Sequence, residues 1–330
     1  MFFVMCADKG HMTDGSKGNG NTGPMYLSIK DVSKTFTTSF TRKKILAVKD
    51  FSLSIDQGEI FGIVGPNGAG KSTVLKMLMG FIRPDKGKIS LLGKEPGDPE
   101  SRKHVGYLPE NPYFYDHLSA TELMRFSALA SGMPPNRVTS QIDRLLKLAG
   151  LESAKNRRLR SYSKGMIQRA GLCFALVHDP DVIVLDEPMS GLDPLGQKMV
   201  VDLILDLKKR GKTVLFCSHI LSDVERICDR TGIMVHGRLR KVLQKSELLD
   251  QENSVRIVVD CQTPELERKC RESDWAIFAE STHVTIMCPR EHLSGALTLC
   301  GKEKIRIITV DNTVNTLEQI FLQTVKETET

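Results

Sequence analysis

The chain has 330 residues, of which 40% are hydrophobic and 26% are charged, and its formal net charge is +6. This length fits one large domain with a smaller one, and the composition excludes a peptide hormone, a collagen-like chain and a wholly disordered protein. No apolar run reaches the roughly 18 to 20 residues that a membrane-spanning helix needs, so we expect no span within this chain. The eight cysteines show no regular spacing, which is typical of a reducing, cytoplasmic compartment.

Strands and helices alternate along most of the chain. Residues 1–24 contain five glycines and no hydrophobic periodicity, which predicts a flexible tail. Strand patterns follow at residues 26–32, 45–55, 59–64, 181–188 and 212–219. Helical patterns lie at residues 72–81, 119–132, 139–150 and 195–211. This alternation predicts an α/β fold with a mainly parallel sheet, an antiparallel portion at its start and a helical portion between residues 100 and 165.

The composition changes after Leu249, where a second unit is expected. Strand, helix, strand, strand, helix and strand patterns follow in this order, and a closing helix is predicted at residues 313–327. The order β-α-β-β-α-β is the split β-α-β pattern of ferredoxin-like domains. We therefore divide the chain into a tail at 1–24, a main domain at 25–249 and a small α+β domain at 250–330.

Residues 65–72 read GPNGAGKS, which fits the phosphate-binding pattern G-x-x-x-x-G-K-[ST] between an apolar strand and a helix. Its glycines allow backbone amides to approach the β- and γ-phosphates of a nucleotide. Lys71 would bring a positive charge to the phosphate oxygens and so also assist catalysis, while the Ser72 hydroxyl would bind Mg²⁺. The alternative, an ordinary glycine-rich turn, is disfavoured by this context. The residues assigned to nucleotide binding here are Gly65, Pro66, Asn67, Gly68, Ala69, Gly70, Lys71, Ser72 and Thr73.

Two acidic residues follow a second buried strand, in the sequence VIVLDEP at residues 182–188. Asp186, at the end of this strand, is placed to hold Mg²⁺ through water. Glu187 is the candidate general base that would polarise an attacking water. Paired acids after a strand are often mere surface charge. Here the phosphate-binding loop supplies the partner that favours a functional role.

Kinases, GTPases and helicases share these two motifs, so a third feature has to decide between them. Residues 162–169 read YSKGMIQR one helix length before VIVLDEP, residues 190–194 read SGLDP, and His219 stands in LFCSHI. These motifs, in this order, resemble those of the ATP-binding subunits of ABC transporters, with SGLDP similar to the D-loop and His219 similar to the switch histidine. YSKGM in place of the more general LSGGQ resembles the drug-exporter type, of which the ending NTLEQIFL is also typical.

The resemblance implies that the nucleotide is shared between two subunits. Two copies would close head to tail, so that the phosphate-binding loop of each faces Ser163 and Gly165 of the other. His219 would contact the γ-phosphate and hold the attacking water together with Glu187. Asp193, in the D-loop sequence, would lie at the nucleotide. Whether the two subunits are identical or different is left open.

Three positions carry alternatives. Phe36 stands where the family places an aromatic ring on adenine, and Phe40 competes for the same role. Glu110 replaces the glutamine that the family uses as a ligand of Mg²⁺; a carboxylate can still reach magnesium, and the effect on metal affinity is left open. Tyr113 and Phe114 lie where the family docks a coupling helix of the membrane subunit, and buried packing is an equally good interpretation for them.

The resemblance thus implies an ATP-hydrolysing subunit, with ATP and Mg²⁺ as cofactors, that drives export through a separate integral membrane permease. Such a protein would be cytoplasmic and peripheral on the inner face of the cell membrane, with no nucleic acid partner. One alternative is a soluble ABC ATPase acting on the ribosome or on nucleic acid, which the single copy of each motif and the lack of a long heptad array disfavour. Another is a module that binds ATP without turnover, which Glu187 and His219 argue against. The small C-terminal domain is either a dimer contact or regulator, or a packing appendage.

Overall fold

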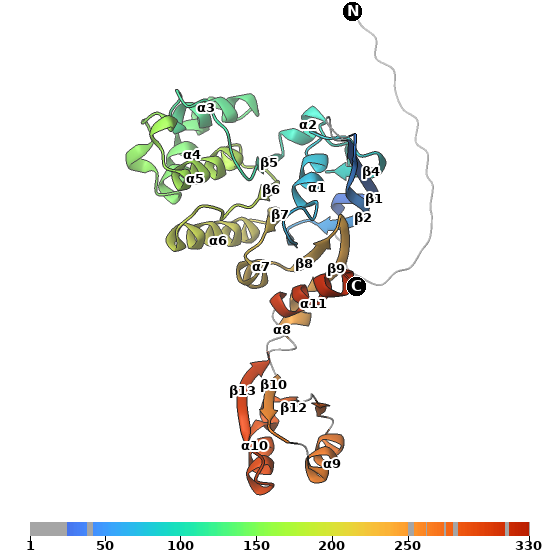
Figure 1. Cartoon of the computed structure of the whole chain (residues 1–330). Helices are drawn as coiled ribbons and strands as arrows, with labels where there is room; N and C mark the ends of the chain where they lie inside the picture. Colours follow the sequence, from blue (N-terminus) through green and yellow to red (C-terminus); the bar gives the residue numbers. More distant parts are fainter. Residues whose placement is uncertain are drawn as a thin grey trace, which may run out of the picture.

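Two bodies of unequal size make up the described chain (Figure 1). The computed structural model describes residues 25–37, 42–249, 254–261, 263–273, 275–279, 283–313 and 317–329. The predicted tail at residues 1–24 and the candidate Phe40 lie outside these ranges. The α/β class predicted from the sequence is confirmed.

The larger body is built on a six-stranded sheet in the order β5-β6-β7-β3-β8-β9. The strands are β3 (Ile60–Val64), β5 (Val105–Leu108), β6 (Val182–Asp186), β7 (Thr213–Ser218), β8 (Arg230–Val235) and β9 (Arg238–Gln244). All neighbours are parallel except β9, which pairs antiparallel with β8. Strands β3, β6 and β7 are buried at every residue, because other elements cover both faces of the sheet. Their carboxyl ends meet at one edge, since Val64 pairs with Ser218 and Asp186 with Cys217.

An antiparallel sheet, predicted for the start of the chain, covers one face. It contains β1 (Met25–Thr37), β2 (Lys44–Asp56) and β4 (Lys86–Leu91) in the order β2-β1-β4. Helix α1 (Lys71–Leu78) contributes Val74, Leu75 and Leu78 to one apolar cluster together with both sheets. The helix is therefore enclosed, and the loop before it is held at the joint between the two sheets.

Helices cover the opposite face and extend into a helical portion (Figure 1). They are α3 (Ala120–Ala130), α4 (Pro135–Leu148), α5 (Lys164–Leu176), α6 (Pro194–Lys209) and α7 (Leu221–Ile227), with two short 3₁₀ turns at Glu152–Ala154 and Leu159–Ser161. One continuous apolar cluster joins these helices to the sheet. The short helix α2 (Pro99–Arg102) is not part of this cluster and contacts β5. The sequence analysis did not predict β5, because four residues of strand within a mostly helical region give too short a pattern.

The smaller body has its own sheet and its own core. Its elements are β10 (Ser254–Val259), α9 (Pro264–Glu272), β11 (Ala276–Ala279), β12 (Val284–Pro289), the 3₁₀ turn Arg290–His292, α10 (Leu293–Lys302) and β13 (Ile307–Thr313). The sheet is antiparallel in the order β11-β12-β10-β13. The core is formed by residues such as Ile257, Ile286 and Trp275, and it is separate from the clusters of the larger body. The observed order of elements is the β-α-β-β-α-β order expected from the sequence.

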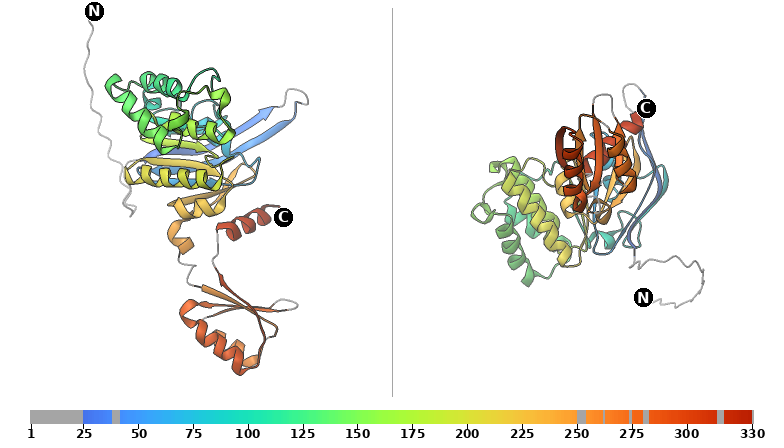
Figure 2. Two further views of the ribbon diagram at one scale, coloured as in Figure 1. Left: turned by 90° about the vertical axis from the view of Figure 1, so that its left-hand side faces the viewer. Right: turned by 90° about the horizontal axis from the view of Figure 1, so that it is seen from below.

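The last helix departs from the domain division made on sequence. After α8 (Lys245–Leu249) the chain forms the smaller body, and α11 (Leu317–Glu329) then returns to the larger body, as the side view in Figure 2 shows. It packs against α7 and β8, and Leu317 is fully buried in the main core. Residues 250–330 therefore do not pack as one unit, because the apolar face of α11 finds its partners on the larger body.

Gly106, on β5, tests the packing between this edge of the sheet and α5. A Cβ atom at this position would lie 2.2 Å from the Ala175 carbonyl oxygen, so the backbone would have to move. We expect Gly106→Ala to lower the free energy of unfolding by about 1–3 kcal/mol, measured by urea denaturation with circular dichroism. The matched control is Gly295→Ala, where no described atom outside its own helix lies within 4 Å and the helix should gain about 0.5–1 kcal/mol. Equal stabilities of the two variants would contradict the packing argument.

Candidate functional site

The glycine-rich loop lies between β3 and α1, at the edge where the parallel strands end. Gly70 precedes α1 with a left-handed φ of 102°, which only glycine adopts without strain. A Cβ atom on Gly65 would lie 2.3 Å from the Met234 carbonyl oxygen, and one on Gly70 would lie 2.3 Å from that of Ala47. At these two glycines the backbone therefore passes too close to its neighbours for any side chain. The loop lines a cavity of about 760 Å³.

This cavity brings together residues from several of the predicted motifs. Every residue from Gly65 to Thr73 lines it, and so do Glu110, Glu187 and His219. Further lining residues, which the sequence analysis did not select, are Ile45, Leu46, Ala47, Ser190, Leu221 and Phe321. The last of these comes from α11, so its place in the cavity depends on a contact between remote parts of the chain. Local sequence patterns carry no signal for it.

Lys71 and Ser72 point to different partners at the start of α1. The Lys71 ammonium group donates hydrogen bonds to the carbonyl oxygens of Gly65, at 2.7 Å, and Pro66, at 3.2 Å. The Ser72 hydroxyl donates to Asp186 Oδ1 at 3.2 Å, although the two residues are far apart in sequence. Helix α1 thus presents one cation and one hydroxyl to the same end of the cavity.

Oxygen donors gather around Asp186 in a way that suits magnesium. Burial raises the pKa of Asp186, and the neighbouring Glu110 and Glu187 carboxylates raise it further, whereas the hydrogen bond from Ser72 lowers it. In the described chain no group of three or more His, Cys, Asp and Glu side chains is arranged to enclose a metal ion. Mg²⁺ commonly uses one or two carboxylates together with phosphate oxygens, so Ser72 and Asp186 fit it when phosphate completes the shell.

Glu187 and His219 form a close polar pair across the ends of β6 and β7. Glu187 Oε2 lies 2.6 Å from His219 Nδ1 and also accepts from the His219 backbone amide at 3.3 Å. The Glu187 side chain is 11% exposed, whereas that of His219 is 59% exposed. The Glu187 backbone has a φ of 49°, an unusual conformation for a residue with a side chain.

Two hydrogen bonds hold this strained backbone. The Glu187 amide donates to the Cys217 carbonyl at 3.1 Å, and the amide group of the buried Gln168 donates to the Glu187 carbonyl at 3.2 Å. Gln168 belongs to the sequence YSKGMIQR but was not selected from it. The sequence signal that could have identified Gln168 is a glutamine within a mostly apolar helix.

Among the described residues that line the cavity, five predicted site residues are not found: Phe36, Ser163, Gly165, Asp186 and Asp193. Asp186 is connected to the cavity through its hydrogen bond with Ser72. Ser163 caps α5 by accepting from the Met166 amide at 3.3 Å, and Asp193 caps α6 by accepting from the Gly196 amide at 2.9 Å. Both are exposed at helix N-termini. Phe36 is 38% exposed on β1, with Lys34 Nζ 5.7 Å from its ring centre, and it pairs across the sheet with Ile45, which does line the cavity.

A second cavity, an apolar groove of about 590 Å³, lies between β5, α3 and α5. Aromatic side chains dominate its lining, and three of them are strongly exposed: Tyr113 at 95%, Tyr115 at 70% and Phe126 at 69%. Phe114 is half-buried, with its ring centre 5.5 Å from that of Phe174. Of the two residues with alternative interpretations, Tyr113 is thus a surface residue and Phe114 packs into the groove wall.

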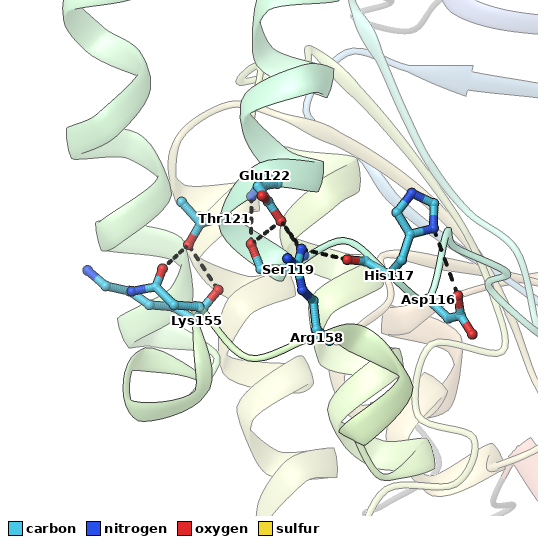
Figure 3. Close-up of polar contacts among 8 residues, drawn as sticks. Asp116, His117, Ser119, Thr121, Glu122, Lys155 and Arg158 are labelled. Atoms are coloured by element: carbon cyan, nitrogen blue, oxygen red, sulfur yellow. Dashed lines mark hydrogen bonds and ion pairs between the residues drawn. The ribbon is translucent and has the colours of Figure 1, made fainter.

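We call this second cavity the aromatic groove. A hydrogen-bond network holds the loop that forms part of it (Figure 3). Ser119 caps α3 and is bonded reciprocally to Glu122, with the Ser119 amide 2.8 Å from Glu122 Oε2. Arg158 then joins Glu122, at 3.2 Å, to the His117 carbonyl oxygen, at 2.6 Å. The Ser119 hydrogen bonds hold the pKa of Glu122 below its usual range. The loop is therefore tied to α3 at its end.

None of the helices in the described part of the chain combines the length and the apolar character that a membrane crossing requires.

Comparisons with known proteins agree on one family. A family model described as ABC transporter matches residues 48–190. An uncharacterized ABC transporter ATP-binding protein of Nostoc sp. is 38% identical over 93% of this chain and 92% of its own length. An uncharacterized ABC transporter ATP-binding protein of Bacillus subtilis is 34% identical over 91% and 99% of the two chains. The Nod factor export ATP-binding protein I of Rhizobium leguminosarum bv. viciae is 36% identical over 67% and 70%.

Solved structures give the same result. The ATP-binding subunit of an ABC transporter is 31% identical with a TM-score of 0.62, covering 68% of this chain and 92% of that one. A dimeric ATP-binding cassette in a post-hydrolysis state, bound to ADP and phosphate, is 25% identical with a TM-score of 0.61, covering 66% and 98%. The chain therefore belongs to the ATP-binding proteins of ABC transporters, as its sequence predicted, and is an enzyme that binds and hydrolyses ATP.

Proposed function

We propose that this chain drives export through a separate membrane permease, by closing a dimer around ATP and opening it after hydrolysis. The observation that carries the proposal is the Glu187–His219 pair, at 2.6 Å, facing the glycine-rich loop within one cavity. The name of the Nod factor export relative supports the direction of transport.

We assign a role to each polar group beside the glycine-rich loop. The amides of residues 65–70 would cradle the β- and γ-phosphates, and Lys71 would turn from its loop carbonyls to the phosphate oxygens. Ser72 and Asp186 would hold Mg²⁺, with the Glu110 carboxylate near Asp186. When bound, the ion would neutralise charge on the phosphates.

Hydrolysis would use the polar pair at the ends of β6 and β7. A water molecule attacks the γ-phosphorus while Glu187 accepts its proton, and the bond from that phosphorus to the bridging oxygen of ADP breaks. His219, more exposed than Glu187, would contact the γ-phosphate and keep the carboxylate oriented. The buried Gln168 and the strained backbone of Glu187 support this orientation.

A second subunit would complete the site. Ser163 and Gly165 lie at the N-terminus of α5, outside the cavity of their own chain, where a hydroxyl and free amides suit a phosphate. Asp193 lies at the N-terminus of α6. Head-to-tail closure would bring these groups to the γ-phosphate of the partner. Phe36 would stack on adenine beside the lining residues of β2.

The aromatic groove is the proposed docking surface for the permease. Its exposed rings form an apolar patch of the kind that marks a protein contact. Residues 107–110 run from the groove, which Tyr107 lines, to the nucleotide cavity, which Glu110 lines. Burial, with a smaller effect of the Asp186 carboxylate, raises the pKa of Tyr107 to about 12.

Removal of the loop cation should weaken nucleotide binding itself. We expect Lys71→Ala to raise the Kd for ATP about ten- to a hundredfold, because one charged hydrogen bond is worth about 1.5–3 kcal/mol. Fluorescence titration with a labelled ATP analogue measures this. Lys209→Ala, which removes an exposed lysine from α6, is the control and should bind normally. Equal affinities in both variants would refute the role of Lys71.

Removal of the base should separate binding from turnover. We expect Glu187→Gln to bind ATP normally, to hydrolyse it at least about a hundredfold more slowly, and to form a dimer only with Mg-ATP. Phosphate release and size-exclusion chromatography with light scattering measure the two effects. Glu291→Gln, whose side chain is 82% exposed in the smaller body, should behave as the wild type. Normal turnover by Glu187→Gln would exclude it as the base.

Truncation of the exposed rings should separate the ATPase from the membrane. We expect Tyr113→Ala with Phe126→Ala to abolish retention by native membranes and recovery of a permease on purification, with basal ATP hydrolysis unchanged. Folding should be preserved, because both rings are mostly exposed. Ile308→Ala, at an exposed position of the smaller body, is the control. Normal membrane retention of the double variant would contradict the docking site.

A further inference from the structure

Helix α11 reaches the nucleotide cavity although it comes at the end of the chain, after the whole smaller body. Phe321, on this helix, lines the cavity together with His219 and Leu221. The other lining residues all come from residues 45–221. The site is thus closed on one side by a helix that no nucleotide-binding motif contains.

Apolar contacts hold α11 in this place. Leu317 is fully buried in the main core, and Ile320, Phe321 and Val325 pack against the same cluster. Their spacing of three and four residues puts them on one face of the helix. The Leu317 amide donates to Glu225 of α7 at 3.4 Å. The start of α11 is therefore fastened to α7 by both apolar and polar contacts.

Helix α7 begins at Leu221, two residues after His219. The side chain of His219 is hydrogen-bonded to Glu187 on one side, and the helix that follows it rests against α11 on the other. The His219 side chain is 59% exposed, so burial does little to fix its position. Its hydrogen bond with Glu187 fixes it on one side only. The half-buried Phe321 ring lines the same cavity as His219 and Leu221 of this segment.

We propose that Phe321 is a positioning residue for ATP hydrolysis, which keeps His219 against Glu187 by supporting the segment between β7 and α7. The inference rests on the roles proposed above for Glu187 and His219. If Phe321 has this role, turnover depends on α11. This helix comes after the smaller body in the sequence. Phe321 contributes to the orientation of the polar pair and accepts or donates no proton.

The test compares the neighbours Phe321 and Leu322 in the full-length chain. We expect Phe321→Ala to lower kcat for ATP about ten- to a hundredfold, the scale of a small misplacement at a catalytic group, with KM within about twofold of wild type. Leu322→Ala is the matched control, because this side chain is 50% exposed and does not line the cavity in the described structure. It should leave both constants unchanged. Phe321→Tyr, which keeps the ring, should restore turnover.

A double variant shows whether Phe321 acts through His219. In a His219→Ala background, Phe321→Ala should change kcat by less than about twofold, because the group it positions is gone. A full additional loss in that background, or a rise in KM alone, would overturn the inference. If Phe321→Ala does not fold by circular dichroism, Phe321→Val keeps an apolar contact with the core, and unchanged turnover in it would overturn the inference equally.

The same set separates this inference from the proposed function. If His219→Ala lowers turnover and Phe321→Ala does not, only the role of Phe321 fails. If His219→Ala has wild-type turnover, the role of His219 fails and the inference falls with it.

Discussion

The fold depends on the close approach of one glycine-rich loop to the carbonyl oxygens of two sheets. Gly65 lies against Met234 of β8, and Gly70 lies against Ala47 of β2, at separations that leave no room for a Cβ atom. The loop therefore touches the parallel and the antiparallel sheet at once. Any side chain at either position would push the sheets apart, so the requirement that exposes backbone amides to phosphate is also the requirement that joins the sheets.

The charges at this edge are arranged for a ligand that carries both signs. Asp186 is buried, which raises its pKa, and two other carboxylates lie near enough to raise it further. Lys71 has only carbonyl oxygens as hydrogen-bond partners in the described structure. Under the proposed function, anionic phosphates with a divalent cation would relieve both conditions, since the phosphates would receive Lys71 and the cation would receive Asp186. Binding and local electrostatic relief would then be the same event.

The sequence predicts those parts of the site that are formed by residues close together in the chain. The phosphate-binding loop, Asp186 and Glu187 each follow a buried strand, and parallel strands bring their carboxyl ends to one edge, so motif and position could be inferred together. Phe321 and the aromatic wall at Phe174 could not, because their neighbours are distant in sequence and depend on how helices dock. The packing of α11 on the larger body could not be predicted for the same reason. Ser163 and Asp193 remain predictions, since a single chain does not contain the partner that would test them.

The smaller body is linked to the nucleotide cavity through the helix that follows it in the chain. It is connected to the larger body at both ends, through α8 on one side and α11 on the other, and α11 packs beside the cavity (Figure 2). Two-ended attachment restricts its movement more than a single linker would. By linkage, if the docking of α11 alters the free energy of the closed, ATP-bound state, then ATP must alter the docking of α11 by the same amount. Under that condition α11 would be part of the nucleotide-binding equilibrium, although it contains no residue of the phosphate-binding motifs.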